Sequence, residues 1–357
     1  MHRPLRSLIS VMAVAIEVVM ILSIAAIMLG MLNSQKTRIS GIGMDMFVRP
    51  ATAGNFIGVT GAPAPIKIAD VLRKVPHVEV VAPVNIQLTS GSTLENIYGI
   101  DFETYNALRP FVFLSGGPFR GPYDLIVDDV FAATKGYKVG DKLPVLKHEF
   151  TICGIVEHGK GGRKLIPITT MGELTDAVGK ASVFYLKLDD PKNKELVRNA
   201  IKATPGMEQF EEQSLDEWLT QMTPENLPGF NIALRVVIGI AVTIGFLVIF
   251  QSMYTAVMER TREIGILKSM GASRSYIVNV VLRESGLLAV TGIGLGVACS
   301  YAMRAFFHVR FPTLDFAITP EWVLRGVVVA FFGALLGALY PAWKAASKDP
   351  IDALAYE

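Results

Sequence analysis

Four long apolar segments, unevenly spaced along the chain, constrain its fold more than any other feature. They cover residues 8–32, 230–258, 286–303 and 322–340. Each is long enough to cross a bilayer as a helix, which takes roughly 20 apolar residues. Only 18% of all residues are charged, whereas about a quarter are charged in a typical soluble domain. The sequence therefore predicts an integral membrane protein whose four transmembrane helices are arranged as one plus three.

The first apolar segment follows Arg3 and Arg6, as the apolar part of a secretory signal peptide would. However, it is longer than the roughly 7–15 apolar residues of such a peptide, and the small-residue cleavage pattern before Asn33 is poor. We therefore interpret it as a transmembrane span.

Basic residues in the short loops indicate the orientation, because Lys and Arg are enriched on the cytoplasmic side of membrane proteins. The loop between spans three and four has only Arg304 and Arg310. We expect both termini and the 259–285 loop in the cytoplasm of a bacterial cell, with the chain in its inner membrane. The net charge of +2 argues against a nucleic-acid partner. The basic residues on the expected cytoplasmic side are Arg3, Arg6, Arg260, Arg262, Lys268, Arg274, Arg283, Lys344 and Lys348.

The large block between spans one and two is predicted to be an α+β extracytoplasmic domain, because strand-like runs alternate there with Gly, Pro and Asp turns. The stretch 54–65 is interpreted as a mobile loop. The predicted strands are 45–48, 78–88, 124–127, 142–145, 150–156, 164–168 and 182–188, and the predicted helices are 67–74, 192–203 and 215–221.

These inferences divide the chain into eight segments. They are the N-terminal cytoplasmic end with the first span (1–32), the extracytoplasmic domain (33–229), the second span (230–258), a cytoplasmic coupling helix and loop (259–285), the third span (286–303), an outer loop (304–321), the fourth span (322–340) and a cytoplasmic tail (341–357).

A dense charge cluster with helical spacing interrupts the apolar segments at residues 254–273. On a helix, Glu259 can pair with Arg262 and Arg260 with Glu263, three residues apart. An apolar strip lies on another face, Gly271 can supply a left-handed cap, and Ser273 can cap the next helix. This pattern predicts a short amphipathic helix at the membrane surface. The strip consists of Ile264, Leu267 and Met270.

Three stretches carry a resemblance to a known family. The stretches are the segment ERTREIGILKSMGAS with the helix after it, the tail YPAWKAASKDPIDALAYE, and the run VGDKLPVLKHEFTICGIVEHG. They resemble permease subunits of the FtsX/MacB-like ABC transporter family. The tail matches at Pro341, Ala342, Ala345, Ala346, Asp349, Pro350, Ala353 and Leu354, and the helix at Glu284, Gly292 and Gly296.

The resemblance implies a non-catalytic permease subunit driven by a separate ATPase, which would bind ATP and Mg. No G-x-x-x-x-G-K-[ST] motif occurs in the sequence, and the Gly-rich run 159–164 lacks its spacing. Alternatively, the charged helix is only a solvated loop without a binding role. Its apolar strip would then be exposed without a function. The residues implied to contact the ATPase are Glu259, Arg260, Arg262, Glu263, Ile264, Gly265, Lys268 and Gly271.

Glu17 lies near the middle of the first span, where a lone carboxylate is costly and needs a partner or a function. We favour a protonated or interhelically bonded Glu17 in a dimer seam over a proton pathway. Two small-residue pairs in later spans permit close helix packing, within one subunit rather than around a pore. They are Gly292 with Gly296 and Gly333 with Gly337.

No catalytic, cofactor or metal site is predicted in this chain. His77, His148 and His158 lack metal-ligand spacing. Cys153, in a predicted outer strand, and Cys299, in span three, are too far apart to form a disulfide.

The sequence thus predicts a permease that couples ATP hydrolysis by a partner to movement of its outer domain, for export or release of a substrate. The alternative is an FtsX-like regulator that activates periplasmic cell-wall hydrolases without transport, and a less favoured one is a receptor without an ATPase. Expected partners are the ATPase, a second permease copy or paralogue, a possible periplasmic adaptor and membrane lipid.

Overall fold

A computed structural model describes residues 4–51, 63–90, 94–224, 226, 228–311 and 313–347. The chain divides into two compact units, which are described separately. The helical unit comprises Met1–Met31 and Pro224–Glu357, and the sheet unit comprises Leu32–Thr223.

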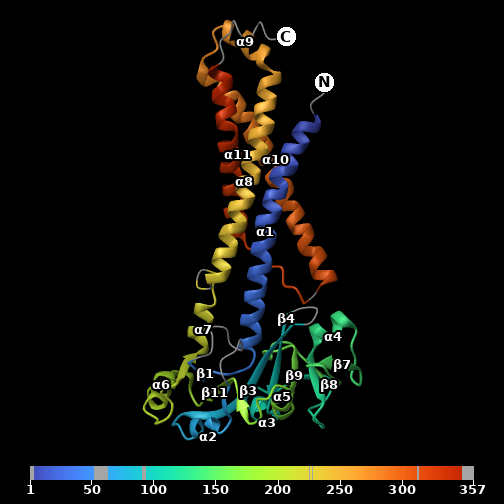
Figure 1. Cartoon of the computed structure of the whole chain (residues 1–357), viewed down its shortest axis with the longest axis vertical. Coiled ribbons are helices and arrows are strands. Elements are labelled where there is room, and N and C mark those ends of the chain that lie inside the picture. The colour runs from blue at the N-terminus through green and yellow to red at the C-terminus, as the bar shows by residue number, and fades with distance from the viewer. Residues whose placement is uncertain are drawn as a thin grey trace. The chain divides into compact units, whose positions relative to one another are not determined.

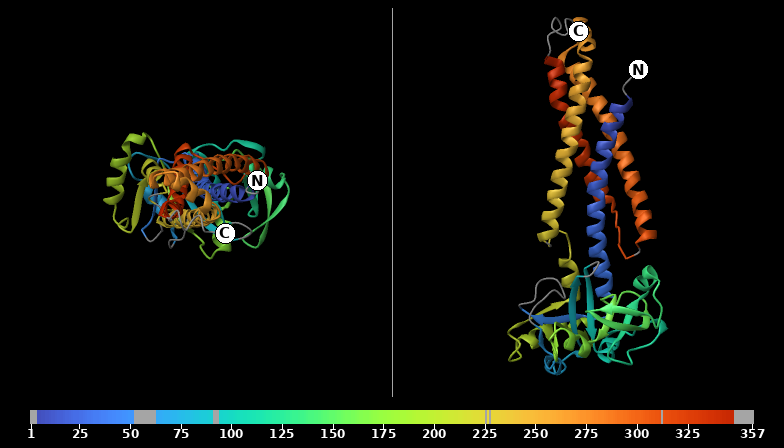
Figure 2. Two further views of the ribbon diagram at one scale, coloured as in Figure 1. Left: turned by 90° about the horizontal axis from the view of Figure 1, so that it is seen from above. Right: turned by 45° about the vertical axis from the view of Figure 1, so that its right-hand side comes forward.

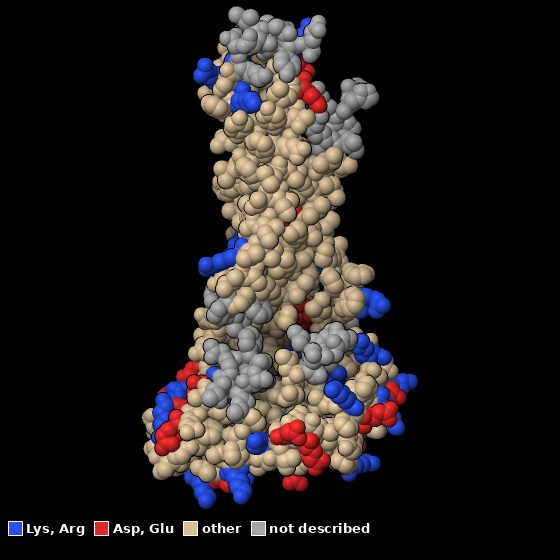
Figure 3. All heavy atoms as spheres, viewed as in Figure 1, with Lys and Arg blue, Asp and Glu red and all other residues tan. Residues whose placement is uncertain are grey.

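The helical unit contains four long helices that are apolar enough to cross a membrane (Figure 1). In this unit α11 packs along both α8 and α10, and Figure 2 shows the helices from two further directions. Figure 3 shows few Lys, Arg, Asp or Glu side chains along the middle of the long helices on the face in view. The helices are α1 (Pro4–Ser40), α8 (Pro228–Glu259), the short α9 (Thr261–Ser269), α10 (Arg274–Arg310) and α11 (Pro320–Ser347).

Each long helix extends past the apolar span predicted for it. Helix α1, for example, runs to Ser40, eight residues beyond the predicted end of its span at residue 32. Polar residues such as Gln35 and Lys36 are good helix formers, so the backbone hydrogen bonding continues after the apolar run stops. Hydropathy marks the part that lipid can cover, not the end of the helix.

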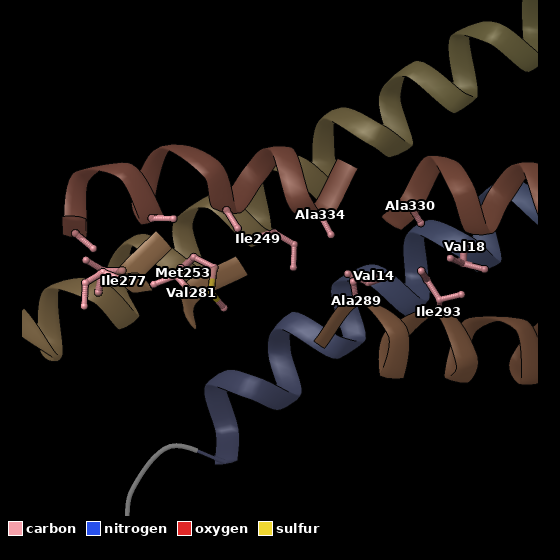
Figure 4. Packing of buried hydrophobic residues seen from close by; sticks show 14 of the residues in the cluster. Val14, Val18, Ile249, Met253, Ile277, Val281, Ala289, Ile293, Ala330 and Ala334 are labelled. Atoms are coloured by element: carbon pink, nitrogen blue, oxygen red, sulfur yellow. The ribbon is translucent and has the colours of Figure 1, made fainter. Parts of the chain in front are cut away.

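Small side chains let the helices of this unit pack closely (Figure 4). Ala330 and Ala334 of α11 are fully or almost fully buried, in a cluster with Val14 of α1, Ile249 of α8 and Ala289 of α10. Lipid is as apolar as these side chains, so close van der Waals contact has to hold the bundle together.

Ten of the described strands form one mixed sheet in the sheet unit, and β2 and β10 form a separate two-stranded one. The order is β12-β1-β11-β3-β4-β9-β6-β8-β5, with β7 paired to β8. Strands β4 and β9 are parallel, as are β6 and β8. The strands are β1 (Met46–Pro50), β2 (Ala64–Pro65), β3 (Val78–Ser90), β4 (Leu94–Ile100), β5 (Phe113–Gly116), β6 (Asp124–Asp128), β7 (Lys142–Val145), β8 (His148–Val156), β9 (Lys164–Pro167), β10 (Lys180–Ala181), β11 (Val183–Leu188) and β12 (Phe210–Ser214).

Short helices connect these strands, so the predicted α+β class is confirmed. All seven predicted strands and all three predicted helices are present, with ends that differ by a few residues. Most of the predicted loop 54–65 lies outside the described residues, and its described end includes β2. The short helices are α2 (Ile68–Leu72), α3 (Phe102–Leu108), α4 (Asp129–Lys135), α5 (Ile168–Leu174), α6 (Lys194–Lys202) and α7 (Leu215–Gln221), with a 3-10 turn at Pro191–Asn193.

Candidate coupling site

The predicted amphipathic helix exists, but it begins later than the charge pattern suggested. Helix α8 ends at Glu259, and Arg260 has a non-helical backbone before α9 starts at Thr261. The predicted caps are confirmed: Gly271 is left-handed with φ of 94°, and the Ser273 side chain accepts a hydrogen bond from the amide of Tyr276. Helix α9 is therefore a short separate segment with a defined turn at each end.

The break at Arg260 makes the predicted pairing of Arg260 with Glu263 wrong. Arg260 instead donates from Nη1 to Glu284 Oε2 of α10, at 2.8 Å. Because Glu259 and Arg262 lie on opposite sides of the break, the spacing of a continuous helix does not apply to them either. The ion pair at Arg260 thus joins the corner between α8 and α9 to a third helix.

One face of α9 is anchored to the helical unit. Gly265 is buried, and Ile264 and Leu267 pack against the buried cluster of the long helices. Lys268 donates from Nζ to the carbonyl of Ala346 in α11, at 2.9 Å. These contacts hold the helix in one orientation.

The opposite face of α9 is exposed and mixed in character. Met270, just after its last turn, is 71% exposed and Ile266 is 44% exposed. Arg262 and Glu263 are exposed beside them. Within the part of the chain that the structure describes, neither Arg262 nor Glu263 forms an ion pair. An apolar pair flanked by both signs of charge suits a protein partner.

This arrangement corrects the predicted apolar strip. Ile264 and Leu267 face inward, so only Met270 of the three predicted residues is available to a partner. Sequence reasoning missed Ile266, because it took the strip of Ile264, Leu267 and Met270 as exposed and did not identify which apolar residues the long helices would cover. The predicted set therefore separates into anchoring residues (Arg260, Ile264, Gly265, Lys268), exposed ones (Glu259, Arg262, Glu263) and the cap Gly271.

The C-terminal segment that resembles the family's terminal motif is described only in part. Pro341, Ala342, Ala345 and Ala346 are buried in α11. The other four matching positions of the tail, Asp349, Pro350, Ala353 and Leu354, lie outside the described residues. Near this end, Lys344 donates to the hydroxyl of Tyr254 in α8 at 2.9 Å.

Glu17 is only 3% exposed within the single chain, so the prediction that it faces a second copy is wrong. Its carboxylate lies against Gly245 of α8, so closely that a Cβ atom added to Gly245 would overlap Oε2 of Glu17. A Cβ atom added to Gly333 in α11 would lie 3.8 Å from Oε1 of Glu17. Oε1 has no hydrogen-bond partner among the described residues. Gly245 was not predicted, because only the register of α8 against α1 shows that it leaves room for the carboxylate.

The predicted glycine pairs lie at helix contacts inside the chain. A Cβ at Gly292 would sit 2.7 Å from Val14 Cβ, and one at Gly296 would sit 2.8 Å from Val18 Cβ, both in α1. A Cβ at Gly337 would be 2.8 Å from the carbonyl oxygen of Phe246 in α8. These three glycines therefore set the spacing of α1 from α10 and of α8 from α11.

Among the described residues, no group of three or more His, Cys, Asp or Glu side chains could hold a metal ion. Cys153 lies in β8, and burial with the nearby Asp124 carboxylate raises the pKa of its thiol to about 12. A hollow of about 530 Å³ in the sheet unit is lined by three basic residues, each of them paired with a glutamate. The pairs are Arg49 with Glu211, Arg198 with Glu217, and Lys202 with Glu212.

Two family models match the chain. The MacB-like periplasmic core domain matches residues 7–204, and the FtsX-like permease C-terminal domain matches residues 235–350. The second match includes α9 and most of the helical unit.

Individual proteins are similar over different lengths. The macrolide export ATP-binding/permease protein MacB of Rhodospirillum rubrum is 26% identical over 99% of this chain, which spans 58% of that protein. The protein of the same name from Chromobacterium violaceum is 28% identical over 62% of this chain and 36% of its own length. The chain thus matches less than two thirds of these relatives. The periplasmic region of MacB from Actinobacillus actinomycetemcomitans is 18% identical, covering 50% of this chain and 92% of that one, with a TM-score of 0.39.

Proposed function

Because the chain belongs to the family of FtsX-like permeases with a MacB-like periplasmic core domain, we propose that it is the membrane component of an ABC exporter whose ATPase docks on the exposed face of α9. The proposal places α9 and both termini in the cytoplasm of a bacterial cell and the sheet unit in the periplasm. The distribution of basic residues between the loops supports this orientation.

The observation that carries the proposal is the two-sided character of α9. Its inner face is fixed by Arg260, Gly265 and Lys268, while Ile266 and Met270 are exposed on the other side. A helix held this firmly transmits a push to α8, α10 and α11, to which it is attached. A loosely attached loop would absorb the same push by bending.

The ATPase is proposed as the partner that binds ATP and Mg. The sequence has no phosphate-binding motif of the Walker type. The similar proteins bear names that combine ATP binding with a permease, which supports a nucleotide-binding partner domain or chain. Closure of two such ATPases would move the long helices, and through α1 the periplasmic sheet unit. A second permease copy would complete the assembly.

Reversing both exposed charges of α9 tests the docking surface. We expect Arg262→Glu/Glu263→Lys to lose co-purification of the ATPase and stimulation of its activity, because neither residue holds the fold. Arg262→Lys/Glu263→Asp, which keeps both charges, is the matched control and should retain them. Normal binding and ATPase rates in the charge-reversed protein, with an unchanged unfolding temperature, would contradict the proposal.

A further inference from the structure

Helix α1 ends inside the sheet unit, against a glycine-rich turn. After its last residue, Ser40, the chain continues through Gly41 and Gly43 into β1. The turn in question is residues 159–162, between β8 and β9, and is called the glycine loop here. Its sequence is Gly-Lys-Gly-Gly. All the contacts described below lie within the sheet unit.

The glycine loop touches the end of α1 through its backbone. The amide of Gly161 donates to the carbonyl of Arg38, at 3.0 Å. Gly41 lies so close to the carbonyl of Gly159 that a Cβ at Gly41 would overlap that oxygen. A Cβ at Gly161 would lie 3.1 Å from Cδ1 of Ile42. Backbone contact this close leaves the last turn of α1 little room to tilt.

The other side of the glycine loop is fixed to the sheet. Gly162 lies against the ring of Tyr98 in β4, where a Cβ would overlap the ring. The Tyr105 hydroxyl of α3 donates to the carbonyl of Lys160, at 2.9 Å. Lys160, only 9% exposed, donates from Nζ to the carbonyl of Arg109, at 2.7 Å. Both tyrosines are buried, so the loop is attached to the core of the unit.

These hydrogen bonds engage two of the groups that a phosphate-binding loop would use. A phosphate cradle needs free amides and a free ammonium group. Here the amide of Gly161 and the ammonium of Lys160 already bind carbonyl oxygens of this chain.

We propose that the glycine loop is a rigid joint that fixes the last turn of α1 to β4 and α3. Glycine usually gives a chain freedom to bend, but at this joint the lack of a side chain allows backbone to pack on backbone and on an aromatic ring. Displacement of α1 then moves the sheet unit without bending at residues 38–43. The inference rests on the proposed function, for which it identifies the residues that carry movement into the sheet unit.

Distances between spin labels in the full-length protein, reconstituted in lipid nanodiscs without an ATPase, test the joint. The labelled protein carries Cys153→Ser and Cys299→Ser. One pair, Thr37→Cys with Glu103→Cys, spans the joint from α1 to α3. The second pair, Lys67→Cys with Glu103→Cys, lies wholly beyond it. All three positions are exposed.

Both pairs should give a single narrow distance in the otherwise unchanged protein. Gly162→Ala should broaden the pair that spans the joint and leave the second pair narrow. The control Gly117→Ala, at a glycine whose Cβ would meet nothing within 4 Å, should leave both narrow. A broad distance across the joint before mutation, no effect of Gly162→Ala, or broadening of both pairs would each overturn the proposal. Because no ATPase is present, failure of ATPase docking cannot produce any of these results.

Discussion

Arg260 and Glu284 form an ion pair of 2.8 Å between the corner at the start of α9 and the side of α10. The pair lies beside the anchored face of α9, and the Lys268 bond to Ala346 holds the other end of the same helix. One polar contact at each end of α9 therefore adds to the packing of Ile264 and Leu267 in orienting the proposed docking surface.

Exchanging the two charges tests the first contact. Arg260→Glu places two carboxylates together, so we expect α9 to lose its orientation and the ATPase to bind more weakly. The double variant Arg260→Glu/Glu284→Arg should restore most of the binding. Partly exposed pairs contribute only about 0.2–1 kcal/mol, so both proteins should still fold. Equal ATPase binding by the single and double variants would show that the pair does not orient α9.

Gly245→Ala tests the space occupied by Glu17. The added methyl group would overlap the carboxylate, and overpacking of this kind costs about 1–3 kcal/mol. We expect a lower unfolding temperature in detergent, and recovery when Glu17→Ala is added. Gly239→Ala, in the same helix with nothing within 4 Å of its Cβ, is the control. Equal effects of the two alanines would rule out the contact with Glu17.

Lys160 predicts a pH dependence of stability. Burial, with a smaller effect of Arg109, lowers the pKa of its ammonium from 10.5 to about 8. Between these values the unfolded chain binds more protons than the folded one. The free energy of unfolding should therefore rise with pH across this window, by at most about 1.4 kcal/mol per pH unit.

Denaturation of the full-length protein between about pH 7 and 9.5 measures this effect. Lys160→Met should remove the rise, whereas Met in place of the exposed Lys138 should leave it unchanged. The same slope with and without Lys160 would mean that another group causes it.

Labelling of introduced cysteines tests the orientation. In a protein with Cys153→Ser and Cys299→Ser, Glu103→Cys of the sheet unit should react with a membrane-impermeant thiol reagent in intact spheroplasts. Ser269→Cys, at the end of α9, should react only after the membrane is opened. Both positions are exposed, so the reverse pattern would invert the topology.

The sequence missed five of the twelve described strands and three of the six short helices of the sheet unit. Strand β8 has alternating buried and exposed positions that can be recognised directly. Helices α3 and α4 were missed, since each has only seven residues and its clearest signal is one capping aspartate, Asp101 or Asp128. Such caps are also common in turns, so they do not distinguish a helix from a loop.

The position of the candidate site in the chain was predicted from the sequence. Which of its residues face inward and which are exposed was not predicted. Charge spacing on α9 could indicate a helix without showing that Arg260 interrupts it and pairs with Glu284. Likewise, no local pattern shows that Ile264 is covered and Ile266 exposed, because that depends on where α10 and α11 pass. Contacts between distant segments decided both outcomes.

Site-specific photo-crosslinking along α9 tests the central claim most directly. A photoreactive amino acid is placed at Ile266, which is exposed, or at the adjacent Leu267, which packs inward. If the ATPase docks on the outer face, residue 266 should crosslink to it, and residue 267 should react only within the permease. Crosslinking to the ATPase from residue 267 alone, or from neither position, would contradict the account.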